Sequence, residues 1–254
     1  MYCPKTPQAE NRCQILLNAA ETLIEEQGVI SFKFSDIAKV ANCSTGSVYK
    51  FFESKEDVLI CLFLRSATSN CIPDFLDIHP ELDDAERFLV PILMTYAVIT
   101  KSPSFTALRS VSVNSKVWTL ASCEKVQRFK VRANRFFDLI MEQAKSAQQS
   151  GMLNESDERL LLLSQLIYFQ LYGQTTAYES RLINKLPMEN KDRAQMDCIL
   201  AIMSAFNWKV QLTPERYERV FKQVNQFISV GTKNKLTCQQ CQKVNASLKN
   251  NLTK

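Results

Sequence analysis

The sequence predicts an all-α protein with a small N-terminal helical domain and a larger C-terminal one. Of its 254 residues, 46% are hydrophobic, whereas glycine and proline number only 5 and 8. So few helix-breaking residues favour long helices over strands joined by turns. Apolar residues also recur with the 3.6-residue period of amphipathic helices. We expect domains over 1–65 and 66–231, followed by a polar, basic tail over 232–254 that is expected to be disordered.

The first helix is expected to begin at Thr6, with Pro7 in the first turn, where a missing N–H costs nothing. Its apolar residues repeat at helical spacing up to Ile24. Gly28 is expected to end it as a left-handed cap, since glycine adopts positive φ without strain.

Three shorter helices follow before residue 65. Ser35 is expected to begin the second and Ser44 the third, because serine hydroxyls accept hydrogen bonds from the first turn of a helix. Ser54, with Asp57 three residues later, resembles a capping box and opens the fourth. Between the second and third helices, Asn42 is expected to adopt the positive φ that the turn needs.

The two middle helices, joined by residues 41–43, form a helix-turn-helix arrangement. In such units the second helix enters the major groove of DNA and its first turn meets base edges. Here this turn carries Ser44, Thr45, Gly46 and Ser47. Small residues permit close approach of the backbone, and hydroxyls bind phosphates or bases. The pattern therefore predicts double-stranded DNA as a partner, although Ser35 and Ser44 could equally be ordinary caps.

The stretch FSDIAKVANCSTGSVYKFFESKEDVL resembles the signature of the TetR/AcrR family of transcriptional regulators. The matching positions are Asp36, Ile37, Ala38, Ala41, Ser44, Gly46, Tyr49, Phe52, Ser54, Lys55 and Glu56. Two positions depart from the pattern, Asn42 for glycine and Cys43 for valine, and both changes are physically mild.

The resemblance implies roles for the remaining polar residues of this stretch. Tyr49, Lys55 and the start of the second helix at Ser35 would contact phosphates. Thr45, Ser47 and Lys50 are the candidates for reading bases. Tyr49 can alternatively be a packed core residue.

The larger half is predicted to contain helices over residues 86–101, 104–113, 116–150, 156–186, 191–209 and 214–230, after a loop or helix break at 66–84. Lys125, Arg128, Arg132 and Arg135 fall at helical spacing on the longest run. Such a row is usually a solvated face, although an acidic effector would favour one inward-pointing arginine.

The resemblance further implies an effector cavity and a dimer interface in this half. The cavity candidates are Phe88, Met94, Tyr96, Phe105, Trp118, Phe129, Phe137, Phe169 and Tyr172. The dimer would form through the helices 156–186 and 191–209, with Leu166, Gly173, Ala177, Ile199, Met203 and Phe206 as interface candidates. Their apolar stripes would suit an ordinary core as well as a four-helix interface.

Other classes of function have little support. There is one histidine and no glycine loop that would cradle phosphates, so an enzyme is not expected, nor a cofactor. Nine cysteines without an export signal suggest reduced thiols, and Cys238 and Cys241 lack further zinc ligands nearby. No apolar run would span a membrane, so we expect a cytoplasmic protein.

The leading interpretation is a dimeric DNA-binding repressor whose palindromic operator is released by a small-molecule effector. The alternative is a DNA-binding protein of the same fold that is controlled by a protein partner. Net charge by itself is no evidence for nucleic-acid binding: it is +5 overall, yet residues 1–65 hold 7 basic and 8 acidic side chains.

Overall fold

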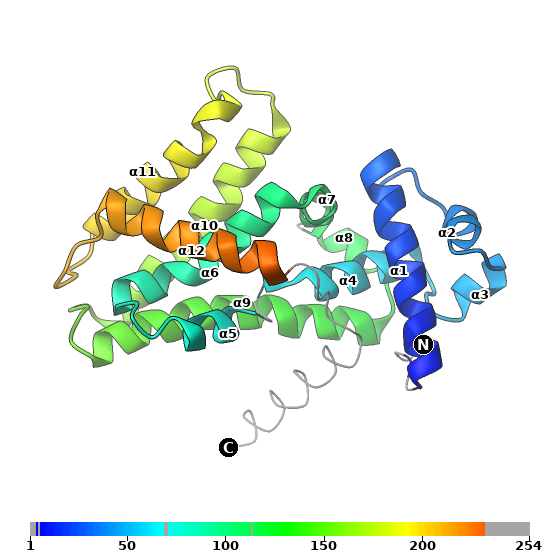
Figure 1. Ribbon diagram of the computed structural model, residues 1–254, viewed down its shortest axis with the longest axis horizontal. Coiled ribbons are helices and arrows are strands. Elements are labelled where there is room, and N and C mark those ends of the chain that lie inside the picture. The colour runs from blue at the N-terminus through cyan, green and yellow to red at the C-terminus, as the bar shows by residue number, and fades with distance from the viewer. Residues whose placement is uncertain (1–3, 5, 69–70, 113, 232–254) are drawn as a thin grey trace. The chain divides into compact units, whose positions relative to one another are not determined.

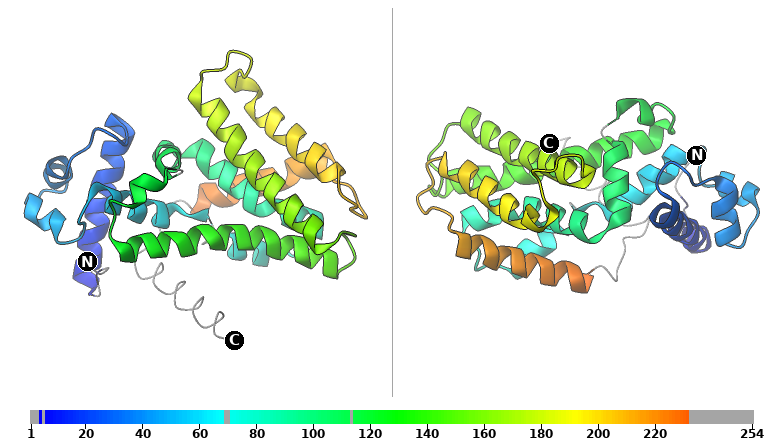
Figure 2. Two further views of the ribbon diagram at one scale, coloured as in Figure 1. Left: turned by 180° about the vertical axis from the view of Figure 1, so that it is seen from behind. Right: turned by 90° about the horizontal axis from the view of Figure 1, so that it is seen from above.

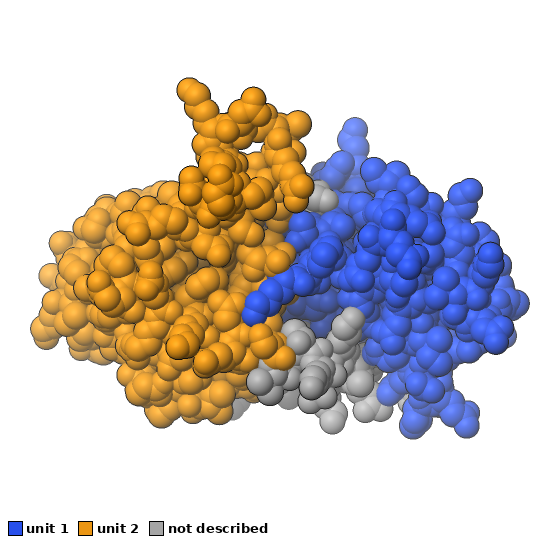
Figure 3. All heavy atoms as spheres, turned by 45° about the horizontal axis from the view of Figure 1, so that its top comes forward, with its two compact units in different colours: residues 1–67, 101–133, 233–254 blue, residues 68–100, 134–232 orange. Residues whose placement is uncertain are grey.

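The computed structural model describes residues 4, 6–68, 71–112 and 114–231, and the tail with Cys238 and Cys241 lies outside them. Within that range the protein is all-α, as predicted, and its only β-type pairing is an isolated bridge between Leu153 and Trp208. Contacts divide these residues into two compact units (Figure 3). Unit 1 contains residues up to 67 together with 101–133, and unit 2 contains 68–100 and 134–231.

Unit 1 is built from the N-terminal helices and three later ones (Figure 1). These are α1 (Pro7–Gln27), α2 (Phe34–Val40), α3 (Thr45–Tyr49), α4 (Lys55–Ser66), α7 (Pro103–Ser112), α8 (Ser115–Trp118) and the start of α9 (Cys123–Gln149). Unit 2 holds α5 (Ile72–Ile78), α6 (Asp84–Lys101), the rest of α9, α10 (Asp157–Ser180), the short 3-10 helix η2 (Met188–Asn190), α11 (Lys191–Ser204) and α12 (Pro214–Gly231).

Local capping explains where the N-terminal helices begin and end. Thr6 caps α1 as predicted, because its hydroxyl accepts from the Ala9 N–H at 3.3 Å. Gly28 ends α1 with φ of 83° and ψ of 163°, so its φ is positive as expected but its backbone is extended rather than left-handed helical. The expected start of α2 at Ser35 is wrong. The helix begins one residue earlier, since the Asp36 carboxylate accepts from the Lys33 N–H at 2.9 Å.

The turn between α2 and α3 has the predicted geometry. Asn42 has φ of 49°. Its N–H donates to the Lys39 carbonyl at 3.2 Å, and the Cys43 N–H donates to the Ala38 carbonyl at 2.9 Å. This pair of bonds is a Schellman motif, which requires one residue with left-handed geometry just after the helix. Asn42 therefore sets the angle at which the chain enters α3.

Substitutions at Asn42 should reveal this requirement as a change in stability. Glycine should be neutral or slightly stabilising, because it adopts positive φ without strain. Valine should lower the free energy of unfolding by about 1–2 kcal/mol, since a β-branched side chain clashes in the left-handed region. Denaturant melts of Asn42→Gly and Asn42→Val measure both values. Equal stability of the two variants would contradict this role for the turn.

The core of unit 1 holds the helix-turn-helix on α1 and α4. Val48 and Phe52 are buried there among apolar residues of α1, α2 and α4. A second cluster places Ile60, Leu64 and Phe129 together with the rings of Phe63 and Trp118. Both Figure 1 and Figure 2 show α2 and α3 as an adjacent pair of short helices, in agreement with their contacts.

Three expectations for the larger half need correction. The segment expected to be a loop contains α5, which has Pro73 in its first turn. The long run expected from residue 116 is interrupted after α8, and α9 begins only at Cys123. At this interruption the N–H of Ser122, the residue before α9, donates to the Asp57 carboxylate. Because Asp57 is distant in the sequence, the local pattern does not predict this bond. Finally, α10 ends at Ser180 rather than at 186, and the next residue, Arg181, adopts a left-handed φ of 52°.

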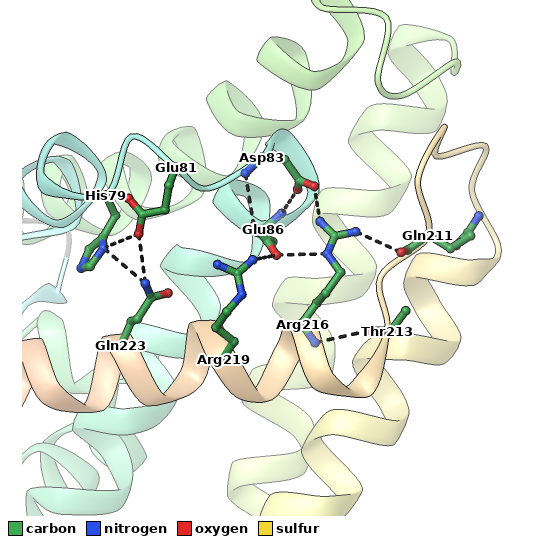
Figure 4. A network of polar contacts seen from close by, with 9 residues as sticks. All are labelled: His79, Glu81, Asp83, Glu86, Gln211, Thr213, Arg216, Arg219 and Gln223. Atoms are coloured by element: carbon green, nitrogen blue, oxygen red, sulfur yellow. Dashed lines mark hydrogen bonds and ion pairs between the residues drawn. The ribbon is translucent and has the colours of Figure 1, made fainter.

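In unit 2, ion pairs join α12 to the chain before and within α6 (Figure 4). Glu86 is almost fully buried and accepts from the guanidinium groups of Arg216, at 3.0 Å, and Arg219. Arg216 also pairs with Asp83, and Gln223 donates to Glu81 at 3.0 Å. A buried carboxylate needs such partners, so these arginines fix α12 along this edge of the unit.

Among the described helices, none is by itself long and apolar enough to cross a membrane. Only α6 and α7 taken together, as a sharply bent pair, reach the required length and composition. Most side chains of α6 are buried within the protein, which accounts for its apolar character.

Candidate nucleic-acid interface

The helix α3 presents a short, nearly bare face to solvent. Ser44 caps it: its hydroxyl accepts from the Ser47 N–H at 3.2 Å and lies 2.9 Å from the Ser47 hydroxyl. Thr45 and Gly46 are exposed, as is Lys50 at the end of the helix. Ser44 is therefore the cap of α3, and the Ser47 hydroxyl is hydrogen-bonded to the Ser44 hydroxyl. Thr45 and Lys50 are the predicted base-reading residues whose side chains have no hydrogen bond in the described structure.

Gly46 has no packing reason to be glycine. A Cβ atom built there would meet only the Ser44 hydroxyl, at 3.8 Å, which is ordinary contact. Glycine within a helix costs roughly 0.5–1 kcal/mol relative to alanine, so its presence calls for another explanation. Packing against the preceding helix is excluded as that explanation. Close approach of the backbone to another molecule remains the prediction.

A groove of about 420 Å³ runs between the loop before α2, the end of α3 and the start of α4. Tyr49 and Lys55 line it, as does Lys33. The Lys55 ammonium donates to the Ile30 carbonyl at 2.6 Å and lies 4.5 Å from the centre of the Phe32 ring. An ammonium has three N–H groups, so this anchored lysine keeps two for an external acceptor.

Tyr49 stands at the rim of the groove with 54% of its surface exposed. Its ring contacts Phe34 edge-on, with 4.9 Å between ring centres. The packed and the exposed interpretations of Tyr49 are thus both partly right, because the ring is supported from one side only. Ser35 is exposed in the first turn of α2, and its hydroxyl lies 3.5 Å from the Asp36 carboxylate.

Lys33 is the member of this surface that sequence reasoning missed. Its side chain is exposed and lines the same groove as Tyr49 and Lys55. Glu53 and Glu56 line the groove too, so the local charge is balanced rather than strongly basic. Such a surface suits recognition by a few placed donors better than attraction by bulk charge.

The nine cavity candidates are dispersed in the structure. Phe105, Trp118 and Phe129 belong to unit 1, where Phe105 and Phe129 contact the Phe63 ring and Trp118 contacts Phe129. In unit 2, Phe88, Met94 and Tyr96 are fully buried, Phe137 and Tyr172 pack on Tyr168, and Phe169 is largely exposed. Phe169 is therefore wrong as a cavity wall within its unit. A surface pocket of about 830 Å³ beside Trp208 and the groove described above are both lined by other residues.

The six interface candidates fall into two groups. Leu166 and Gly173 are exposed on α10, and Ala177 is half-buried. Ile199, Met203 and Phe206 are buried within their own chain, so their assignment to a dimer interface is wrong. The side of α11 that carries Ile199 and Met203 packs inside unit 2, whereas the partner-facing side would carry smaller residues such as Ala201.

The basic row on α9 is also not a solvated face. Lys125 and Arg132 are buried in unit 1, whereas Arg128 pairs with Glu124 at 2.5 Å. A 3.6-residue period of charges cannot by itself show which charges will find buried partners.

Comparison with known proteins agrees with this geometry. Residues 16–61 match the model of the bacterial regulatory proteins of the tetR family. An uncharacterized HTH-type transcriptional regulator of Mycobacterium tuberculosis is 29% identical over 92 residues, which cover 36% of this chain and 46% of the relative. The match thus spans about half the length of that protein.

Two solved structures share the fold at low sequence identity. A structure assigned to the TetR family, from Mesorhizobium loti MAFF303099, has a TM-score of 0.60 at 15% identity, covering 80% of this chain and 99% of the other. The transcriptional regulator FadR from Bacillus subtilis, in complex with stearoyl-CoA, has a TM-score of 0.55 at 18% identity, covering 73% and 97%.

Proposed function

Because this chain belongs to the tetR family of bacterial regulatory proteins, we propose that it is a dimeric repressor that binds a palindromic operator and is released by a small-molecule effector. It acts in the cytoplasm, by binding rather than by catalysis. The observation that carries the proposal is the exposed start of α3, where Gly46 leaves the backbone open beside Thr45.

In this proposal each part of the surface has a separate role. Thr45, Ser47 and Lys50 read base edges in the major groove, while Gly46 lets the helix backbone approach. Ser35, Ser44, Tyr49, Lys55 and also Lys33 hold phosphates and thereby orient the helix. Two copies of the surface, related by a two-fold axis, would read half-sites about one helical turn apart.

Selection of random duplexes with the full chain tests the proposal. We expect recovery of a palindrome whose half-sites are spaced by about 10 base pairs or a multiple of that distance. Thr45→Ala should relax base preference at defined positions of the recovered site. Failure to enrich any duplex at moderate salt would refute DNA binding as the function.

Phosphate contacts should appear in the salt dependence of operator binding. Lys33→Met and Lys55→Met should each flatten the log–log slope of affinity against salt by about 0.9, because one counterion fewer is released. Only Lys55→Met should also lower the melting temperature, since only Lys55 anchors the Ile30 carbonyl. An unchanged slope for either variant would remove that lysine from the phosphate contacts.

A protein partner in place of a small effector is the second candidate. The dense packing of Phe88, Met94 and Tyr96, all fully buried, favours it, since an effector would have to open this core. Stearoyl-CoA, the ligand of the FadR structure, is a suitable probe. Native mass spectrometry should show one molecule bound per subunit if the effector site accepts long acyl chains. No adduct with this probe would leave the partner-controlled regulator as the better model.

A further inference from the structure

The helix-turn-helix is held by an ion pair that is unusual in being fully buried. The Asp57 carboxylate and the Lys125 ammonium lie 2.8 Å apart in unit 1, and their side chains are 0% and 3% exposed. Asp57 is in the first turn of α4 and Lys125 in the first turn of α9. Burying two charges costs more than their attraction returns unless further hydrogen bonds satisfy them. The bonds around this pair therefore indicate what it holds together.

Four further hydrogen bonds of this pair reach the chain after α3 or the residue before α9. Asp57 accepts from the Glu53 N–H at 2.9 Å, and from the N–H and the hydroxyl of Ser122, each at 2.9 Å. Lys125 donates to the Phe51 carbonyl at 3.1 Å and lies 5.3 Å from the centre of the Phe52 ring. Burial alone would raise the pKa of the Asp57 carboxyl, but hydrogen bonds from Lys125, Ser122 and Glu53 outweigh it and lower that pKa.

These contacts act together with the core packing of Val48 and Phe52 to fix the direction of α3. The helix has only five residues, so it cannot hold its own orientation through a long packed face. Its start is set by Ser44 and Asn42, and the chain directly after it is tied at Phe51 to Lys125 of α9 and at Glu53 to Asp57 of α4. Any rotation of the first turn of α9 would therefore move the end of α3. The same helix α9 continues without a break to Gln149, and its residues from 134 onward belong to unit 2.

We propose that Asp57 and Lys125 are positioning residues for DNA binding, which fasten the DNA-reading helix α3 to the start of α9. The inference rests on the proposed DNA-binding function. It adds to that function two residues that are buried and do not themselves contact DNA. A displacement of α9 would then reach α3 through two side chains rather than through the whole core.

A second buried pair in the same unit provides a matched control. Arg65 and Glu21 lie 2.6 Å apart, and their bonds reach Asn18 at 2.7 Å and Ser104 at 3.2 Å. They join α1, α4 and the start of α7, at a distance in the chain from α3. Neutralising either pair should destabilise unit 1 to a similar degree. Only the first pair should change how α3 meets DNA.

The test compares two neutral double variants of the full chain, Asp57→Asn with Lys125→Met and Glu21→Gln with Arg65→Met. Removing both charges avoids leaving one of them buried without its partner. The probe is the duplex selected by the wild-type protein, with affinity measured by fluorescence anisotropy across a salt series. Thermal melts on the same samples report stability.

We expect the Asp57/Lys125 variant to lose about tenfold or more in affinity, the equivalent of at least one base contact. Its salt slope should stay unchanged, because no phosphate contact is removed. The Glu21/Arg65 variant should melt at a similar temperature and keep its affinity within about threefold. The single variant Lys125→Arg should keep binding, since a guanidinium can still donate to both Asp57 and the Phe51 carbonyl.

Equal losses of affinity in the two double variants, or wild-type affinity in the first, would overturn the inference. If the first double variant does not fold, Ser122→Ala removes one hydrogen bond to Asp57 and leaves the ion pair in place. It should weaken DNA binding with little change in melting temperature, and unaltered binding would again contradict the inference. A wild-type chain that selects no duplex would instead refute the proposed function.

Discussion

A glutamate in place of Leu166 should separate the proposed dimer into monomers that keep their helical content. Leu162, Leu166, Phe169 and Gly173 are all exposed, and their spacing puts them on one face of α10. In a symmetric dimer each Leu166→Glu carboxylate would be buried without a partner, at a cost of about 3–5 kcal/mol. Sedimentation velocity should show monomers, and operator affinity should fall with loss of the second half-site.

The same charge at Met203 should have a different effect. Met203 is 1% exposed inside unit 2, so Met203→Glu should unfold the helices and reduce the helical circular dichroism signal. Val210 is half exposed in the loop before α12, and Val210→Glu serves as the control that should change neither property. Intact dimers of Leu166→Glu would move the interface away from this face of α10.

Gly46→Leu should abolish operator binding while the protein stays folded. Gly46 is exposed, with no atom other than the Ser44 hydroxyl within 4 Å of an added Cβ, so the folded chain can accommodate a side chain. In the complex, however, a leucine would stand between the backbone of α3 and DNA. Affinity for the selected duplex should fall by at least 100-fold, the loss of about two base contacts.

Gly46→Ala should change the stability of the protein and its operator affinity in opposite directions. It should raise the free energy of unfolding by about 0.5–1 kcal/mol, because alanine stabilises a helix relative to glycine. It should also weaken operator binding, though less than leucine does. Thermal melts and binding isotherms on both variants provide the measurements. A destabilised Gly46→Ala, or full binding by Gly46→Leu, would show that DNA does not approach this residue closely.

Much of the DNA-reading unit could be predicted from the sequence because short-range hydrogen bonds build it. Thr6 and Ser44 cap helices through bonds to residues three positions away, and Asn42 turns the chain through bonds within the same short segment. Even the error at Ser35 amounts to one residue, since the bond from the Lys33 N–H to the Asp36 carboxylate starts the helix at Phe34.

The positions of the long helices were predictable for a related reason, but the roles of their faces were not. Periodicity shows that α10 and α11 have apolar residues at helical spacing, yet a buried stripe and a partner-facing stripe look alike. In the structure Met203 belongs to the core, whereas Leu166 stays exposed. Deciding between them requires knowing what packs on each side.

The sequence by itself determined the all-α class, the helix-turn-helix and the left-handed turn at Asn42, since each depends on residues within about one helical turn of one another. Only the tertiary structure decided that residues 101–133 join the N-terminal unit and that Lys125 is buried. The bonds of Asp57 to Ser122 and Lys125 span 65 and 68 residues. Partners so distant in the chain meet only after the intervening helices have packed, so no local pattern announces them.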